Sequence, residues 1–186
     1  MPRLFIGIKI ADQEKLIDLS TTLRKQLSDC IANWVDPKNF HLTLKFLGDV
    51  ENYYINSIKT LLNDISLNHQ SFNLQYNKLG YFGHRSQPKV IWFDFKPNNE
   101  LTKLQQAIEN SLIDLGFEPN EKKYSPHLTF ARIKKISKAA NLDEIIKLNS
   151  VYSEMIKIDS FQLIESILYP TGPVYTTVAE FSLKSN

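Results

Sequence analysis

The tripeptide His-Leu-Thr occurs twice in this chain of 186 residues, in HLTLKFLG (41–48) and in HLTFAR (127–132). A strand-like run and a helical pattern precede each copy, and a helical pattern and two strand-like runs follow it. An internal repeat of an α+β unit explains this doubling better than a βαβ array, because several strands adjoin without a helix between them. The sequence therefore predicts one α+β domain over 1–186. Its two lobes would face each other across a cleft and be related by a rough two-fold axis.

Hydrophobic periodicity gives the expected positions of the elements. Helices are expected at 12–31, from a cap at Asn52 to about 65, at 98–115 with a stop at Gly116, and at 138–148. Strands are expected at 3–10, 41–48, 72–79, 89–95, 127–132, 151–158, 160–168 and 174–183. The stretches GYFGHRSQP (80–88) and PTGP (170–173) are expected to be a loop and a turn, because they are rich in turn residues.

Composition limits the class of protein. Hydrophobic residues make up 42% and charged residues 23%, which is typical of a soluble globular domain. A formal net charge of +2 suits a phosphate-bearing ligand but not a protein that coats nucleic acid. Cys30 is the only cysteine, so an intrachain disulfide and a cysteine-based zinc site are excluded. No secretory signal or membrane-spanning stretch is recognisable, so we expect a cytoplasmic protein without membrane association.

Each His-Leu-Thr copy presents an imidazole beside a hydroxyl. Side chains alternate between the faces of a strand, so His41 and Thr43 point the same way while Leu42 points into the core. His127 and Thr129 repeat this arrangement. If a rough two-fold axis relates the lobes, both pairs can reach one cleft.

Two histidines on opposite sides of a reacting centre can act as base and acid in one step, because an imidazole gives or takes a proton near neutral pH. Threonine hydroxyls between them can stabilise anionic oxygens. Phosphodiester cleavage fits this set. A metal site would need a third ligand, which His-x-Thr does not supply, so no metal or other cofactor is expected. A repeat could also persist without catalytic function, so the repeat alone does not establish catalysis.

The residues resemble a known family at this point. The paired His-x-Thr motifs resemble those of the two-histidine (2H) phosphoesterases. Five further segments resemble, in order, the bacterial and archaeal RNA 2′,3′-cyclic phosphodiesterases, the LigT-like branch formerly called 2′-5′ RNA ligases. These segments are RLFIGIKI, WVDPKNFHLTLKFLG, PKVIWF, YSPHLTFAR and SILYPTGPVY. The resemblance covers nearly the whole chain.

The resemblance implies a bilobal α+β fold, with two intertwined, pseudo-symmetric lobes whose antiparallel sheets line a central cleft and whose helices lie outside. It also implies hydrolysis of an RNA 2′,3′-cyclic phosphate end to a 2′-phosphomonoester. It implies His41 as proton donor to the leaving 3′ oxygen and His127 as the base that activates water, an assignment that the sequence alone leaves open. Thr43 and Thr129 would hold the phosphate. Joining of a cyclic phosphate end to a 5′-hydroxyl is a side activity of the family.

Arg132 and Tyr175 are further candidates for binding substrate. Arg132 resembles the family's arginine after the second motif, and a guanidinium suits a phosphate. Strict alternation puts Arg132 on the face opposite His127, so either the strand bulges or ends before it, or Arg132 braces the scaffold. Tyr175 could reach the mouth of the cleft.

The other polar and aromatic residues near the motifs are expected to play lesser parts. Lys45 shares the face of His41 and is expected to be solvated, although it could meet an RNA phosphate. Phe46 has the parity of a core residue. His84 and Arg85 could contact nucleotides from the 80–88 loop, but a plain connection is the favoured interpretation there, and His69 is expected at the surface near a helix end.

Three functional alternatives stay open from sequence. The first is a metal-independent cyclic phosphodiesterase acting on RNA ends, expected to be monomeric. The second is a phosphodiesterase acting on 2′-5′ linked oligonucleotides or small cyclic nucleotides. The third is a non-catalytic module that binds RNA ends.

Overall fold

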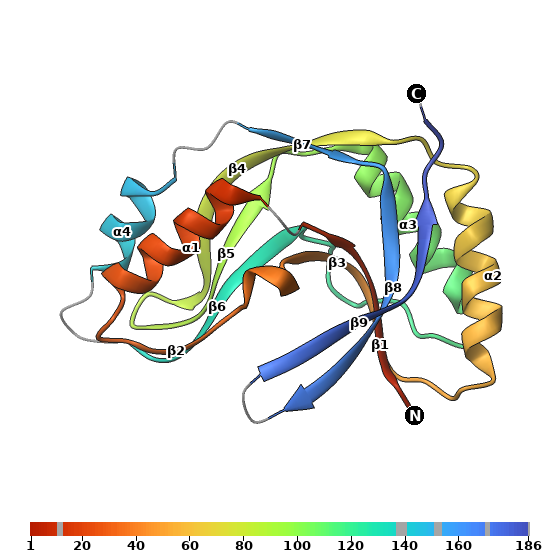
Figure 1. The fold of residues 1–186 in the computed structure, drawn as a ribbon, viewed down its shortest axis with the longest axis horizontal. Coiled ribbons are helices and arrows are strands. Elements are labelled where there is room, and N and C mark those ends of the chain that lie inside the picture. Colours follow the sequence, from red (N-terminus) through yellow and green to blue (C-terminus); the bar gives the residue numbers. More distant parts are fainter. Residues whose placement is uncertain (11–12, 137–140, 151–153, 170–171, 186) are drawn as a thin grey trace.

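The computed structural model describes residues 1–10, 13–136, 141–150, 154–169 and 172–185, which build an antiparallel sheet covered by helices (Figure 1). The sheet has nine strands, in the order β7-β4-β5-β6-β3-β1-β8-β9, with β2 paired to β6. The strands are β1 (Arg3–Lys9), β2 (Ile31–Trp34), β3 (His41–Asp49), β4 (Phe72–His84), β5 (Gln87–Phe95), β6 (His127–Lys135), β7 (Met155–Ile158), β8 (Ser160–Tyr169) and β9 (Gly172–Ser182). The predicted α+β class is confirmed.

The helices lie in two pairs over different ends of the sheet (Figure 1). One pair is α1 and α4, with α4 against β4, and the other is α2 and α3, with α2 against β9 and α3 against β3. The helices are α1 (Glu14–Gln26), α2 (Tyr54–Ser66), α3 (Asn99–Ile113) and α4 (Leu142–Leu148), and a short 3-10 turn, η1 (Pro37–Asn39), precedes β3. No helix among the described residues is long and apolar enough to cross a membrane.

The strand order is symmetric about the junction of β3 and β6. Moving outward, β1 corresponds to β5 and β8 corresponds to β4. The two halves of the sequence exchange strands, because β4 follows the first motif but pairs with β5, while β8 follows the second motif but pairs with β1. The two central strands pair through Leu42 and Leu128. The axis of pseudo-symmetry therefore passes between the two motifs.

Apolar periodicity explains the core. The inward leucines of α1 at positions 16, 19 and 23 are buried, as are Ile58 and Leu62 of α2. Leu42 and Leu128, at the centre of the sheet, are fully buried. The helix α3 begins after a cap in which Asn98 accepts from the Leu101 N–H at 2.9 Å, and Gly116 beyond its end has φ +84°. The start of this helix near Asn98 and the stop at Gly116 were predicted.

Three predictions about elements are wrong. The first helix does not reach 31, because the chain turns after Leu27 and enters β2, where Ile31 is 58% exposed. Asn52 gives no side-chain cap to α2. The stretch 80–88 is no loop, because β4 and β5 continue through it as a hairpin, with a register shift between Phe82 and Gly83. The predicted helical residues 12 and 138–140, the strand residues 151–153 and the turn residues 170–171 lie outside the described part of the chain.

Candidate active site

The two motifs meet at the centre of the sheet. Because β3 and β6 run antiparallel with Leu42 opposite Leu128, His41 comes beside Thr129 and Thr43 beside His127. The leucines are fully buried, whereas the two histidines and two threonines are partly exposed. The alternation expected from sequence therefore holds within each tripeptide, and it brings both imidazoles and both hydroxyls to one face.

The two imidazoles are held in the same way. Nδ1 of His41 lies 2.7 Å from the carbonyl oxygen of Asn39, and Nδ1 of His127 lies 2.7 Å from the carbonyl oxygen of Ser125. A carbonyl oxygen can only accept, so Nδ1 of each neutral ring carries the proton and donates it. Nε2 of each ring is then the nitrogen that can exchange a proton with a bound molecule.

Aromatic side chains flank each imidazole. The ring of His41 lies 4.9 Å from that of Phe5 and 5.1 Å, edge to face, from that of Tyr175. The ring of His127 lies 5.0 Å, edge to face, from that of Phe82. These contacts fix the plane of each ring, and they place the candidate Tyr175 directly against His41.

A β-bulge in each central strand changes the parity after the threonine. Trp92 pairs with Thr129 but Ile91 pairs with Ala131, so β6 has one extra residue at Phe130. Phe130 and Ala131 are both buried and Arg132 is exposed, so Arg132 returns to the face of His127. Of the two interpretations left open by the sequence, the bulge is the one observed.

The matching bulge in β3 overturns the expectations for Lys45 and Phe46. Gly7 pairs with Thr43 but Ile6 pairs with Lys45, which leaves Leu44 as the extra residue. The Lys45 side chain is only 2% exposed, and its ammonium lies 2.5 Å from Oε1 of Glu109. Phe46 is 62% exposed. Strict alternation failed here because each repeat has two consecutive buried residues at the same place. Every later side chain in the strand therefore points to the opposite face from the one that alternation predicts.

Electrostatics links Arg132 to the site. The pKa of His41 is lowered from its usual value of 6.5, chiefly by burial and further by the charges of His127 and Arg132, against the opposing hydrogen bond to Asn39. Burial also raises the pKa of Tyr175, while Arg132 and Arg3 lower it. The Arg132 guanidinium is thus within electrostatic range of both His41 and Tyr175.

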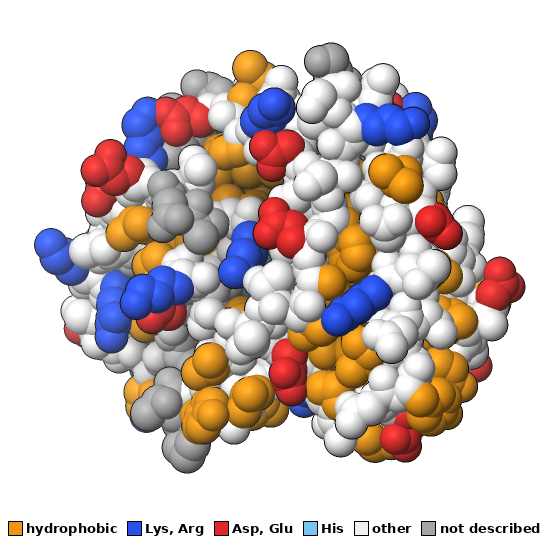
Figure 2. Space-filling view, turned by 45° about the vertical axis from the view of Figure 1, so that its right-hand side comes forward, with side chains coloured by type: hydrophobic (Ala, Val, Ile, Leu, Met, Phe, Trp, Pro, Cys, Tyr) orange, Lys and Arg blue, Asp and Glu red, His pale blue; other side chains and the backbone are white. Residues whose placement is uncertain are grey.

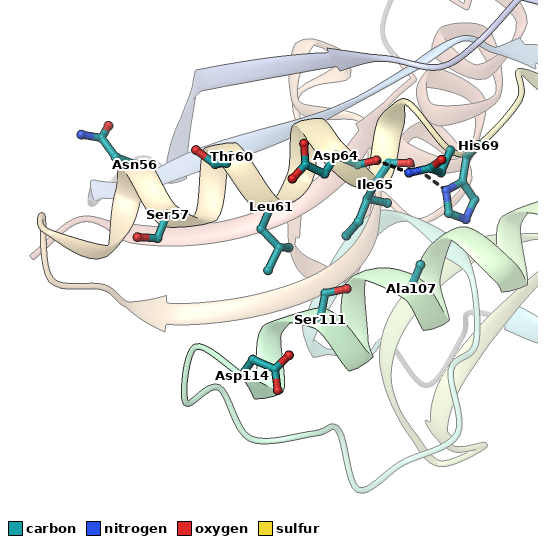
Figure 3. A pocket seen from close by; sticks show the side chains of 11 residues that line it. Asn56, Ser57, Thr60, Leu61, Asp64, Ile65, His69, Ala107, Ser111 and Asp114 are labelled. Carbon is teal, nitrogen blue, oxygen red and sulfur yellow. Dashed lines mark hydrogen bonds between the residues drawn. The ribbon is translucent and has the colours of Figure 1, made fainter.

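The remaining histidines lie elsewhere. His84 hydrogen-bonds Ser86 at the tip of the β4–β5 hairpin, and Arg85 there forms an ion pair with Asp143 at 2.6 Å. His69 follows the end of α2 and lines a hollow between α2 and α3 (Figure 3). The carboxylates of Asp64 and Asp114 also line this hollow, which makes it unsuited to a phosphate.

Sequence reasoning missed three aromatic residues near the histidines and wrongly expected a fourth, Phe46, to be a core residue. The three are Phe5, Phe82 and Trp92, and the ring of Phe82 lies 5.0 Å from that of Trp92. Phe5 and Trp92 look like ordinary strand residues in the sequence, and their role depends on which strands become neighbours. Phe46 had a signal, because it occupies the same place after its motif as Arg132 does after the second.

Comparisons with known proteins find a matching family model and similar relatives. The family model described as LigT like Phosphoesterase matches residues 8–92 and 95–175. The protein named RNA 2′,3′-cyclic phosphodiesterase of Aquifex aeolicus is 29% identical over 184 residues, which cover 97% of both chains. The protein of the same name of Thermotoga maritima is 33% identical over 174 residues, covering 88% of this chain and 91% of that one.

Solved structures share the fold. The protein TT0787 of Thermus thermophilus superposes with a TM-score of 0.83 at 22% identity, covering 99% of both chains. Escherichia coli LigT complexed with 3′-AMP superposes with a TM-score of 0.76 at 21% identity, covering 98% of both chains. These likenesses support the arrangement of strands and helices described above.

Proposed function

The chain belongs to the LigT-like phosphoesterase family, and on that premise we propose that it hydrolyses 2′,3′-cyclic phosphate ends of RNA to 2′-phosphomonoesters. One observation carries the proposal: two imidazoles share a face, and each has its Nδ1 proton held by a backbone carbonyl and Nε2 left for a substrate. The name shared by relatives about 30% identical over most of the chain supports the substrate class.

The mechanism follows from this pair. Water attacks phosphorus while Nε2 of His127 accepts a proton from it, and the bond between phosphorus and O3′ breaks as Nε2 of His41 donates a proton to O3′. The products are a 2′-phosphomonoester and a free 3′-hydroxyl, so atoms and charges balance. Thr43 and Thr129 donate hydrogen bonds to the non-bridging oxygens, and no step requires a metal ion.

The residues five positions after each histidine orient the substrate. The catalytic groups are nearly symmetric, but Phe46 and Arg132 occupy equivalent places on the two central strands. A guanidinium favours the phosphate and an exposed phenyl ring favours a base. We assign Arg132 to the phosphate, with Tyr175 beside it, and Phe46 to the nucleobase.

The substrate is expected to touch the protein over a few terminal nucleotides. The face drawn in Figure 2, on which no histidine side chain is visible, carries Lys and Arg side chains interspersed with Asp and Glu rather than a continuous basic stripe, so this face offers no track for a longer RNA. A net charge of +2 agrees with a small contact to the RNA backbone.

The test is an assay with an oligonucleotide that ends in a 2′,3′-cyclic phosphate, in the presence of EDTA. We expect turnover, with the product phosphate at the 2′ position by phosphorus NMR. Binding without turnover would instead favour an RNA-end binding module. Faster cleavage of 2′-5′ linked oligonucleotides or of small cyclic nucleotides would move the substrate class to those alternatives.

The lowered pKa of His41 predicts the acidic limb of the pH–rate profile. A mechanism that needs one neutral and one charged imidazole gives a bell, and its acidic limb lies at the lower of the two pKa values, whichever histidine donates. Because the pKa of His41 lies below its usual value of 6.5, we expect this limb in kcat/KM below pH 6.5. A bound phosphate offsets the positive charges that lower the pKa of His41, so the acidic limb in kcat should lie at a higher pH than the one in kcat/KM. An acidic limb of kcat/KM at neutral pH would contradict the assignment.

A further inference from the structure

The segments that lead into the two catalytic strands are held in different ways. Before β3, the chain forms β2, which pairs with β6, and then η1, capped by Asp36. The equivalent segment before β6 is 117–126, which is neither helix nor strand. Its last carbonyls include that of Ser125, which holds the ring of His127. Something other than strand pairing must therefore fix this segment.

A buried ion pair takes that place. Nζ of Lys45 contacts Oε1 of Glu109 at 2.5 Å and donates to the carbonyl oxygen of Glu118 at 2.8 Å. The carboxylate of Glu109 also accepts hydrogen bonds from the backbone N–H of Asn120 at 2.7 Å, from the side-chain amide of Asn120 at 3.0 Å and from the side-chain amide of Gln105 at 3.1 Å. The pair thus connects β3 and α3 to 118–120.

A second anchor lies closer to the histidine. The hydroxyl of Tyr124 donates to the carbonyl oxygen of Thr43 at 3.2 Å, and burial raises the pKa of this phenol. Lys45 lies two residues after Thr43 on the same strand. The segment 118–126 is therefore attached at several points to the part of β3 that carries the first motif.

Stability alone is a poor explanation for this ion pair. Burying a lysine and a glutamate costs desolvation energy that often equals or exceeds the Coulomb attraction, so a pair of apolar residues would serve a purely structural purpose as well. The geometric specificity of the contacts is what an apolar pair would lack. We propose that Lys45 and Glu109 are positioning residues that hold 118–126, so that the Ser125 carbonyl keeps the ring of His127 in its reactive orientation.

This inference rests on the proposed function for its kinetic part. Glu109→Gln and Lys45→Met should lower kcat by ~10–100-fold with KM within about threefold, because a small displacement of a catalytic group affects chemistry more than binding. Glu100→Gln is the matched control, since it removes the same charge from an exposed ion pair with Lys103 on the same helix, and it should leave kcat unchanged.

Ring nitrogen NMR tests the clamp without any activity. At a pH where both imidazoles are neutral, the wild type should show the Nδ1–H form for His41 and His127. In Glu109→Gln we expect His127 alone to become a mixture of tautomers, with His41 as the internal reference. This measurement stands even if the wild type fails to cleave RNA ends.

A double variant separates positioning from folding. Lys45→Met/Glu109→Leu replaces the ions with apolar side chains and should restore thermal stability relative to the single variants. We expect the kcat of the double variant to stay low and its His127 imidazole to remain a mixture of tautomers. A double variant with wild-type kcat, or an unchanged His127 ring in Glu109→Gln, would overturn the proposal.

Discussion

Replacing either His41 or His127 with alanine is expected to lower kcat on a 2′,3′-cyclic phosphate end by ~10²–10⁴-fold, the usual contribution of a general acid or base. Both rings are partly exposed, so the fold should persist, as near-wild-type circular dichroism and thermal unfolding would report. The double variant should be little worse than either single one, because the two groups act in one step. His69→Ala is the control, because His69 lines the hollow between α2 and α3 rather than the face that carries the two motifs, and it should not affect the rate. A near-normal rate from either single variant would remove that residue from the mechanism.

The direction of proton transfer can be tested with a leaving group that needs no acid. In a 2′-(4-nitrophenyl) phosphodiester lacking the 3′-hydroxyl, nitrophenolate departs unprotonated. If His41 is the acid, the decrease in kcat caused by His41→Ala should be smaller on this substrate than on the cyclic phosphate, while the decrease caused by His127→Ala should be unchanged. The reverse pattern would exchange the two roles.

Replacing Arg132 with methionine is expected to lower kcat/KM by ~10–100-fold, because a hydrogen bond to a charged group contributes about 1.5–3 kcal/mol. Arg132→Lys should fall between, since lysine keeps the charge but not the planar fork. The methionine variant should also move the acidic limb of kcat/KM upward, because Arg132 lowers the pKa of His41. Lys157→Met, on the edge strand β7, removes the same charge and should change kcat/KM less than about twofold, as distant surface positions usually do. Equal decreases in kcat/KM in the two methionine variants would mean that Arg132 acts only through long-range attraction of the substrate and not through a direct contact.

The meeting of the two motifs could be predicted from the sequence, whereas several helix and strand boundaries could not. Alternation within each His-Leu-Thr is local, and a repeat implies symmetry, so the meeting of the two motifs followed from both. The sheet face on which Arg132 and Phe46 lie could not be predicted, because the bulges depend on how β1 and β5 pair with the central strands. The aromatic neighbours Phe5 and Phe82 were missed for the same reason, whereas Tyr175 was a candidate from the sequence. The burial of Lys45 was missed because its partner Glu109 is distant in sequence and faces it only once α3 has packed on β3.

The exchange of strands between the two halves has a consequence for synthesis. The first strand of the chain, β1, needs β8 as a neighbour, and β8 begins only at Ser160. A nascent polypeptide emerging from the ribosome therefore cannot complete the sheet around the first motif until the residues of β8 have been translated. Folding that depends on such distant partners is slow, because loop closure precedes the contacts that reward it. A truncated product ending before β8 would leave an edge of β1 open to association with other chains.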